Sequence, residues 1–148
     1  MQAIIFCGLQ AAGKSSFYKT YFFNTHIRIN LDMLHTRRRE DLLLAACIEM
    51  KQPFVVDNTN PSVKERAKYV SLARDAGFEV VCYYFSEGLE ACLARNAERD
   101  VSQQIPVKGV LATYYKFQVP LFEENFHKLY HVRLADNNDF VIEEQPQN

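Results

Sequence analysis

Residues 8–16 contain a spacing of glycine, lysine and serine that suits the binding of a phosphate chain. Two glycines enclose four residues and are followed by lysine and serine, in the pattern G-x-x-x-x-G-K-[ST]. We expect Gly8 and Gly13 to adopt backbone angles closed to other residues, so that successive N–H groups turn inward around an anion. A helix that begins at Gly13–Lys14 would add the partial positive charge of its N-terminus. The pattern therefore predicts a site for the phosphates of ATP.

Two side chains of this loop have individual predicted roles. Lys14 would reach the β- and γ-phosphates, and the hydroxyl of Ser15 would bind Mg²⁺. The other positions would contribute mainly backbone N–H groups. The predicted ATP-binding residues are Gly8, Leu9, Gln10, Ala11, Ala12, Gly13, Lys14, Ser15 and Ser16.

Two aspartates that follow predicted strands are candidates for the remaining chemistry. Asp57 ends the apolar segment 54–56 and is placed like the acidic residue that holds Mg²⁺ in phosphate-transferring enzymes, although it is also a good helix cap. Asp32 follows the β-rich segment 26–30 and is suited either to act as a general base on an acceptor hydroxyl or to cap the next helix. The residue types alone leave both alternatives open for Asp32.

Two groups of arginines are candidates for binding phosphate. The run 37–39 lies one to two helical turns after Asp32, where it would bind an acceptor phosphate or form a solvated helix face. Arg95 and Arg99 are four residues apart, so a helix would present them on one face. Paired arginines can stabilise charge on a transferring phosphoryl group, but they also form ordinary ion pairs, here with Glu98.

The elements that must position these residues alternate along the chain. Short apolar runs predict strands at 3–7, 26–30, 54–56, 80–85 and 130–134. Between them, helices are predicted at 15–23, from about 32 to 50, from Pro61 to about 76 with Asn60 or Thr59 as the cap, at 89–99, and from Pro106 to at least 117.

This alternation predicts an α/β fold of the P-loop NTPase type, with a parallel sheet of about five strands and helices on both faces. Ligands of such sheets bind at the carboxyl ends of the strands, so Lys14, Asp32 and Asp57 should converge on one site. One domain is predicted over residues 1–134, followed by a polar tail over 135–148.

The composition narrows the classes of partner. A net charge of −1 over 148 residues gives no global attraction to nucleic acid or membrane, so a polyanion would need a local patch. The four cysteines form no C-x-x-C pair and are expected to be buried reduced thiols of a cytoplasmic protein. His127 and His131 share a helical spacing without a third ligand and are interpreted as structural. Neither a signal peptide nor a membrane span is predicted.

Several motifs together resemble the polynucleotide 5′-hydroxyl kinase family, in particular the kinase half of the animal polynucleotide kinase–phosphatases. The resemblance runs in order over about 130 residues and includes the loop 8–17, Asn30-Leu31-Asp32, the segment 57–61, Arg95 with Arg99, and Tyr115-Lys116-Phe117-x-x-Pro120. It implies that Asp32 is the general base on a 5′-hydroxyl, that Arg95 and Arg99 belong to a lid over the triphosphate, and that Asp57 lies near acceptor and metal. No D-x-D-x-T/V phosphatase motif is present, so only the kinase half is expected.

One position near the predicted acceptor site differs from the family's pattern. Three residues after the catalytic aspartate the phage enzyme has an arginine that contacts the acceptor's phosphate, whereas this chain has His35. The predicted acceptor-binding residues are His35, Arg37, Arg38, Asp57 and Asn58.

Three functions follow from these motifs. The leading one is ATP- and Mg²⁺-dependent transfer of the γ-phosphate to the 5′-OH of DNA or RNA. The second keeps the reaction but uses a small acceptor such as a nucleoside, a sugar or an antibiotic. The third is a nucleotide-binding module that regulates a partner without catalysis.

Overall fold

The computed structural model describes residues 1–147. Its strands are β1 (Gln2–Gly8), β2 (Ile27–Ile29), β3 (Phe54–Asp57), β4 (Glu79–Phe85), β5 (Lys128–Leu134) and β6 (Phe140–Glu144). Its α-helices are α1 (Lys14–Tyr21), α2 (Leu31–Leu34), α3 (Arg37–Met50), α4 (Val63–Asp75), α5 (Leu89–Glu98) and α6 (Val107–Lys116). Two 3₁₀ turns, η1 (Val101–Gln103) and η2 (Phe122–Glu124), flank α6.

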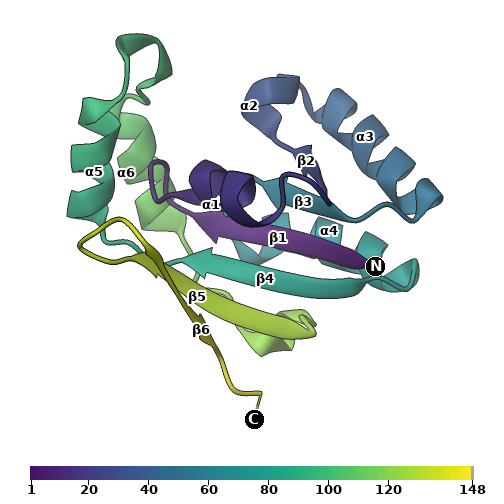
Figure 1. The fold of residues 1–148 in the computed structure, drawn as a ribbon. Helices are drawn as coiled ribbons and strands as arrows, with labels where there is room; N and C mark the ends of the chain where they lie inside the picture. The colour runs from purple at the N-terminus through teal and green to yellow at the C-terminus, as the bar shows by residue number, and fades with distance from the viewer. Residues whose placement is uncertain (148) are drawn as a thin grey trace.

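All six strands form one sheet in the order β2-β3-β1-β4-β5-β6 (Figure 1). The first five are parallel, with Ile4 of β1 in register with Val55 of β3 and Val81 of β4. These three residues are at most 2% exposed, as expected for strands covered on both faces. The predicted α/β fold with a parallel sheet is confirmed.

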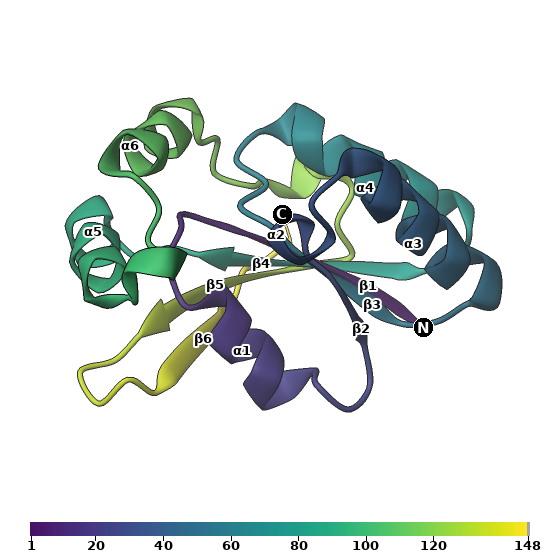
Figure 2. The same ribbon diagram turned by 90° about the horizontal axis from the view of Figure 1, so that it is seen from above.

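Two apolar clusters lie on opposite faces of the sheet. Because side chains alternate along a strand, Ile5 joins the cluster that includes Leu44 of α3 and Tyr69 of α4, whereas Phe6 joins the cluster that includes Phe17 of α1. Figure 2 shows α1 below the sheet, with α3 and α4 above it. Helices therefore cover both faces, as predicted.

The helical stretch predicted from residue 32 to 50 is two helices. The short α2 ends at His35, whose φ is 73°, and α3 begins after Thr36, whose hydroxyl accepts the N–H of Arg39. Asn30, rather than Asp32, caps α2 by accepting the N–H of Met33. Asn30 and Thr36 each cap a separate helix, and these polar caps produce the break. The spacing of apolar residues, from which the single helix was predicted, does not report them.

The start of α4 also differs from the prediction. Ser62 is the cap, and its hydroxyl accepts the N–H of Glu65 and donates to the Glu65 carboxylate, so these two side chains hold the first turn together. Asn60, one of the two predicted caps, instead donates to the carbonyl of Phe6 on β1. The loop after β3 is thereby tied to the sheet.

The segment that the sequence predicts as a polar tail contains β6. This strand pairs antiparallel with β5, from Leu134 opposite Phe140 to Tyr130 opposite Glu144. Phe140 packs against Phe17, with 5.0 Å between ring centroids, so the segment is joined to the core beneath α1. This edge strand combines the apolar residues 140–142 with two exposed glutamates, Glu143 and Glu144, and the residues before and after it are polar.

The cysteines are buried in the fold, and His127 forms a hydrogen bond to the backbone. The four cysteines are buried free thiols, as expected. His127 precedes β5 and His131 lies within it, so the two do not share a helix face, and Nδ1 of His127 accepts the N–H of Val80. None of the helices in residues 1–147 combines the length and apolar character that crossing a bilayer requires.

Candidate functional site

The loop between β1 and α1 turns through positive backbone angles. Ala11 has a φ of 63° and Gly13 a φ of 100°, and α1 begins directly after Gly13. Gly13 therefore needs the conformational freedom of glycine, as predicted. Gly8 is a glycine for a different reason, because a Cβ there would lie 2.8 Å from Cβ of Phe85. The prediction of an unusual backbone angle at Gly8 is wrong; close packing of β1 on β4 accounts for this glycine.

Lys14 is folded back onto the loop. Its Nζ donates to the carbonyl oxygens of Gly8 at 2.9 Å and Leu9 at 2.6 Å. Burial lowers the pKa of Lys14 to about 8, the positive charge of Arg99 adds to this lowering, and the nearby Asp57 partly opposes it. The ammonium is thus held where an anion bound in the loop would meet it.

Ser15 and Asp57, the two predicted metal ligands, are in contact. The Ser15 hydroxyl donates to Oδ2 of Asp57 at 3.3 Å, and Asp57 is 2% exposed at the end of β3. Since Ser62 caps α4, Asp57 has no capping role. A carboxylate beside a hydroxyl is a donor set that suits Mg²⁺.

Asp32 lies on a turn that is tied to the end of β3. Asn30 donates from Nδ2 to the carbonyl of Asp57 at 2.6 Å, and Oδ1 of Asn58 accepts the N–H of Leu31 at 2.8 Å. These bonds hold the first turn of α2 beside residues 57–58, with Asp32 itself exposed. Lys14, Asp57 and the turn bearing Asp32 therefore all lie at the carboxyl edge of the parallel strands.

The comparisons with known proteins identify the family to which the chain belongs. Residues 39–120 match a protein family described as AAA domain (AAA_33), and this match covers more than half of the chain. The chain belongs to this family. It is a P-loop kinase domain, and its family relationship supports a phosphotransferase.

Curated relatives confirm the predicted resemblance to polynucleotide kinases. The chain is 22% identical to the bifunctional polynucleotide phosphatase/kinase of Schizosaccharomyces pombe, over 84% of this chain and 32% of that protein. It is 29% identical to the putative bifunctional polynucleotide phosphatase/kinase of Acanthamoeba polyphaga mimivirus, over 86% of this chain and 32% of that protein. It is also 26% identical to an L-seryl-tRNA(Sec) kinase of Methanococcus maripaludis, over 79% of this chain and 52% of that protein. The chain thus spans one third to one half of these relatives' lengths.

Solved structures show the same fold in P-loop proteins. Kti12 from Chaetomium thermophilum, crystallised with ADP-AlF3, superposes with a TM-score of 0.73 at 15% identity, over 90% of each chain. A gluconokinase from Sinorhizobium meliloti superposes with a TM-score of 0.63 at 18% identity, over 91% of this chain and 83% of that one. At such identities the likeness concerns the fold alone.

In this P-loop kinase domain the two predicted lid arginines differ in whether they contact the phosphate loop. Arg95 of α5 donates to the carbonyl of Ala11 in the phosphate loop at 3.2 Å, and its Nη2 lies 3.6 Å from a carboxylate oxygen of Glu87. Arg99 follows the last residue of α5 with extended backbone angles, and its side chain is exposed. Of the two, Arg95 is the one in direct contact with the loop.

Two charged residues of the domain's site were missed by sequence reasoning. Arg28 of β2 contacts both Ser15 and Asp57. Its only signal in the sequence was that a charged residue stands between two apolar residues of a short strand. Glu40 of α3 is fully buried and accepts from Asn58 at 2.9 Å and from Tyr69 at 2.8 Å. Glu40 sits inside a charge run that reads as a solvated helix face.

Glu40 supports the turn that carries Asp32. Burial would raise the pKa of Glu40, but hydrogen bonds from Tyr69, Asn58 and Arg37 outweigh it and lower that pKa. Because Asn58 joins Glu40 to the N–H of Leu31, the buried carboxylate anchors the start of α2 through one side chain. Nη1 of Arg37, a predicted acceptor-binding residue, donates to Glu40 at 3.0 Å, while the Arg37 side chain stays 55% exposed.

His35 and Arg38, the other basic residues predicted at the acceptor, are both exposed. His35 lies in the break between α2 and α3, and Arg38 lies in the first turn of α3. Within residues 1–147, no three His, Cys, Asp or Glu side chains gather into a metal cluster. The candidate metal site therefore consists of one carboxylate and one hydroxyl.

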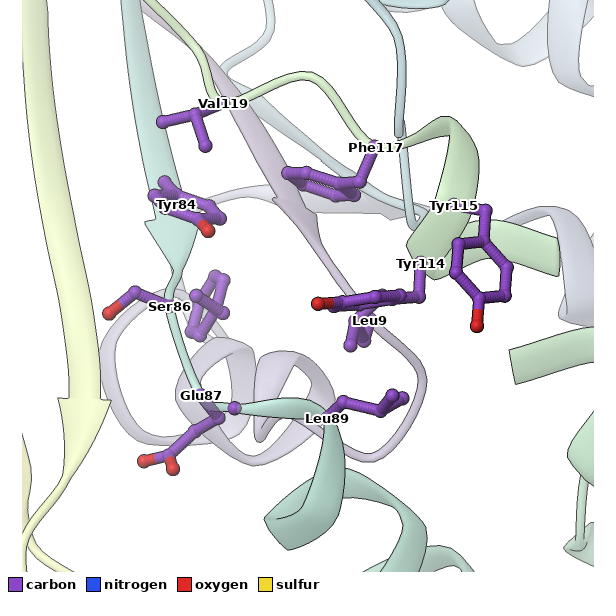
Figure 3. Close-up of a pocket in the computed structure, with 11 residues that line it drawn as sticks. Leu9, Tyr84, Ser86, Glu87, Leu89, Tyr114, Tyr115, Phe117 and Val119 are labelled. Carbon is purple, nitrogen blue, oxygen red and sulfur yellow. The ribbon is translucent and has the colours of Figure 1, made fainter. Parts of the chain in front are cut away.

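A cavity of about 410 Å³ lies beside the phosphate loop, between the end of β4, the start of α5 and α6 (Figure 3). Tyr114 lies over Leu9 with its hydroxyl directed into the space, and Tyr115 points away from it. The lining residues are Leu9, Tyr84, Phe85, Ser86, Glu87, Gly88, Leu89, Tyr114, Tyr115, Phe117 and Val119. With no lysine or arginine and one carboxylate in this lining, the cavity suits a neutral planar group rather than a phosphate.

Proposed function

We propose that this domain is an ATP- and Mg²⁺-dependent kinase that transfers the γ-phosphate of ATP to the 5′-hydroxyl of DNA or RNA. The observation that carries the proposal is the turn bearing Asp32, which two asparagine side chains tie to the Asp57 strand end beside the phosphate loop. A carboxylate on that turn would face an acceptor hydroxyl across the γ-phosphate. The polynucleotide phosphatase/kinase relatives support the 5′-hydroxyl as that acceptor.

Each proposed residue has one task in the transfer. Asp32 accepts the proton of the acceptor hydroxyl, the acceptor oxygen bonds to the γ-phosphorus, and the bond from that phosphorus to the β–γ bridging oxygen breaks to release ADP. Lys14, Arg95 and Arg99 offset the negative charge that develops. Ser15 and Asp57 would hold Mg²⁺, which when bound neutralises charge on the β- and γ-phosphate oxygens. Residues 8–16 would bind the phosphates of ATP.

A small-molecule acceptor is the second candidate, and two observations favour it. Nη1 of Arg37 already donates to the buried Glu40, which leaves only the rest of this guanidinium for the phosphates of a polynucleotide. The chain as a whole carries a net charge of −1, whereas a polynucleotide normally binds a surface rich in lysine and arginine. His35 and Arg38 would then contact an acceptor that carries few or no phosphates.

The decisive experiment is transfer of labelled γ-phosphate from ATP with Mg²⁺. The acceptors are a 5′-OH oligonucleotide of DNA, one of RNA, the same oligonucleotides already carrying a 5′-phosphate, a nucleoside and a sugar. We expect label on the 5′-OH oligonucleotides alone, and a loss of at least about 10²-fold in rate for Lys14→Ala. Label on the nucleoside or sugar alone, or no label on any acceptor with ATP binding intact, would contradict the proposed acceptor.

The affinity for ATP should fall as the pH rises above about 8. With its pKa lowered to about 8, Lys14 is charged below that pH and neutral above it, whereas phosphates stabilise the charged ammonium. Binding above pH 8 must therefore take up a proton, and the dissociation constant should rise by up to about tenfold per pH unit. Titration calorimetry in two buffers of different ionisation enthalpy measures this uptake.

Lys14→Arg is the matched control for the pH dependence. An arginine stays charged throughout the range, so this variant should show no proton uptake between about pH 7 and 10. An affinity of the wild type that is constant over the same range would show that Lys14 is charged in the free domain.

A further inference from the structure

Arg28 occupies the space between the two proposed metal ligands. Its Nε donates to Oδ2 of Asp57 at 2.8 Å, and its Nη2 donates to Oγ of Ser15 at 3.0 Å. Ser15 donates to the same Oδ2 at 3.3 Å. One guanidinium thus holds both oxygens that the proposed function assigns to Mg²⁺.

A cation at this position is required by the burial of Asp57. The Asp57 side chain is 2% exposed, and a buried carboxylate is costly unless a positive charge and hydrogen bonds compensate it. Arg28 and a divalent metal ion can each supply that charge. They cannot both hold Oδ2 at close range, because two cations beside one oxygen repel each other strongly in a partly buried site.

We propose that Arg28 is an internal counter-cation that competes with the divalent metal for Asp57 and Ser15, and thereby sets the metal affinity of the domain. The guanidinium keeps the carboxylate compensated in the free domain and weakens the binding of metal alone. When the metal binds together with a nucleotide, the negative phosphates also hold the metal and favour it over Arg28 at Asp57. The inference rests on the proposed assignment of Ser15 and Asp57 as metal ligands.

The structure gives Arg28 room to withdraw. It projects from β2, a three-residue strand at the edge of the sheet, and its side chain is 27% exposed. Its guanidinium carbon lies 5.9 Å from the ring centroid of Tyr18, whose face offers a second favourable contact for a cation. The side chain can therefore leave Asp57 without disturbing the core.

Binding of Mn²⁺ without nucleotide, followed by electron paramagnetic resonance, tests the competition. We expect Arg28→Gln to bind Mn²⁺ at least about tenfold more tightly than the wild type, because one positive charge has been removed beside the metal. Its melting temperature should be lower without metal and should rise on adding Mg²⁺ by more than that of the wild type. Arg133→Gln, which removes an exposed arginine of β5, is the matched control and should behave as the wild type.

Two further variants keep the test decisive. Arg28→Lys preserves the charge but cannot form the same fork to both oxygens, so we expect tighter Mn²⁺ binding than in the wild type; it serves if Arg28→Gln does not fold. Asp57→Asn should lose the Mn²⁺ site. Unchanged Mn²⁺ affinity in the folded Arg28 variants would overturn the role of Arg28, and unchanged affinity in Asp57→Asn would overturn the metal assignment beneath it. The assay contains neither ATP nor acceptor. The Mn²⁺ affinities of the Arg28 variants and of Asp57→Asn can therefore be interpreted even if the domain proves not to be a kinase.

Discussion

Replacing Asp32 by asparagine is expected to lower the rate of phosphoryl transfer at least about 10²-fold while leaving the affinity for ATP unchanged. The variant keeps the shape of the side chain and removes only its ability to take a proton. Asp32 is exposed, and Asn30 provides the helix cap, so neither α2 nor the core depends on the carboxylate. A kinetic effect can therefore be separated from a folding effect.

The measurement is single-turnover transfer with the preferred acceptor, combined with ATP binding and thermal melting of the same variant. Asp41→Asn is the matched control, since Asp41 is an aspartate of α3 whose side chain is 56% exposed and pairs with Lys68. It should retain the wild-type rate. If Asp32→Asn retains that rate as well, Asp32 is not the general base. If it binds ATP normally and keeps its full biological effect, a regulatory nucleotide-binding module becomes the better explanation.

Replacing Glu124 by glutamine is expected to lower the free energy of unfolding by about 3–5 kcal/mol, the usual result of removing one partner of a buried ion pair. Arg66 is fully buried, and its Nε and Nη2 donate to the two carboxylate oxygens of Glu124 at 2.8 and 3.0 Å. Arg66 also donates to the carbonyls of Asn60 and Gln118. The variant would leave this guanidinium charged, buried and without a counter-ion.

Urea unfolding at neutral pH measures the effect, with Glu123→Gln as the control because Glu123 is the neighbour of Glu124 in η2 and takes no part in the pair. The control should change stability by no more than about 0.5 kcal/mol. A double variant, Arg66→Met with Glu124→Leu, should recover part of the loss, since apolar residues of similar volume can replace a buried ion pair. A Glu124→Gln variant as stable as the control would show that the pair contributes nothing net.

The position of the pair links this stability to the site. Arg66 joins α4 to the loop that follows β3, through the carbonyl of Asn60. The same loop accepts the N–H of Gly8 at the carbonyl of Thr59, at 3.0 Å. The ion pair therefore helps to fix the segment that carries Asp57 and Asn58, without itself touching the proposed reacting groups.

The sequence by itself determined the features that depend on neighbours along the chain. The strand, the phosphate loop and the helix at residues 3–21 follow from an apolar run and fixed glycine and lysine spacings, and the positive φ of Gly13 follows from the same pattern. Alternating strands and helices likewise predicted the parallel sheet, because a helix that connects two strands of one sheet usually returns the chain so that the strands run parallel. The apolar segments that precede Asp32 and Asp57 also placed both residues at the carboxyl ends of strands, where parallel sheets bind their ligands.

Only the tertiary structure decided which distant side chains meet at the site. Arg28 and Asp57 are 29 residues apart, and they meet because β2 lies beside β3. Glu40 is buried because Tyr69 of α4 and Asn58 surround it, although its own neighbours in sequence are charged. The residues after Ala135 form β6 because the open edge of β5 offers backbone partners and Phe17 offers an apolar contact to Phe140. Local patterns predict the elements, whereas burial and pairing depend on surfaces that exist only once those elements have packed together.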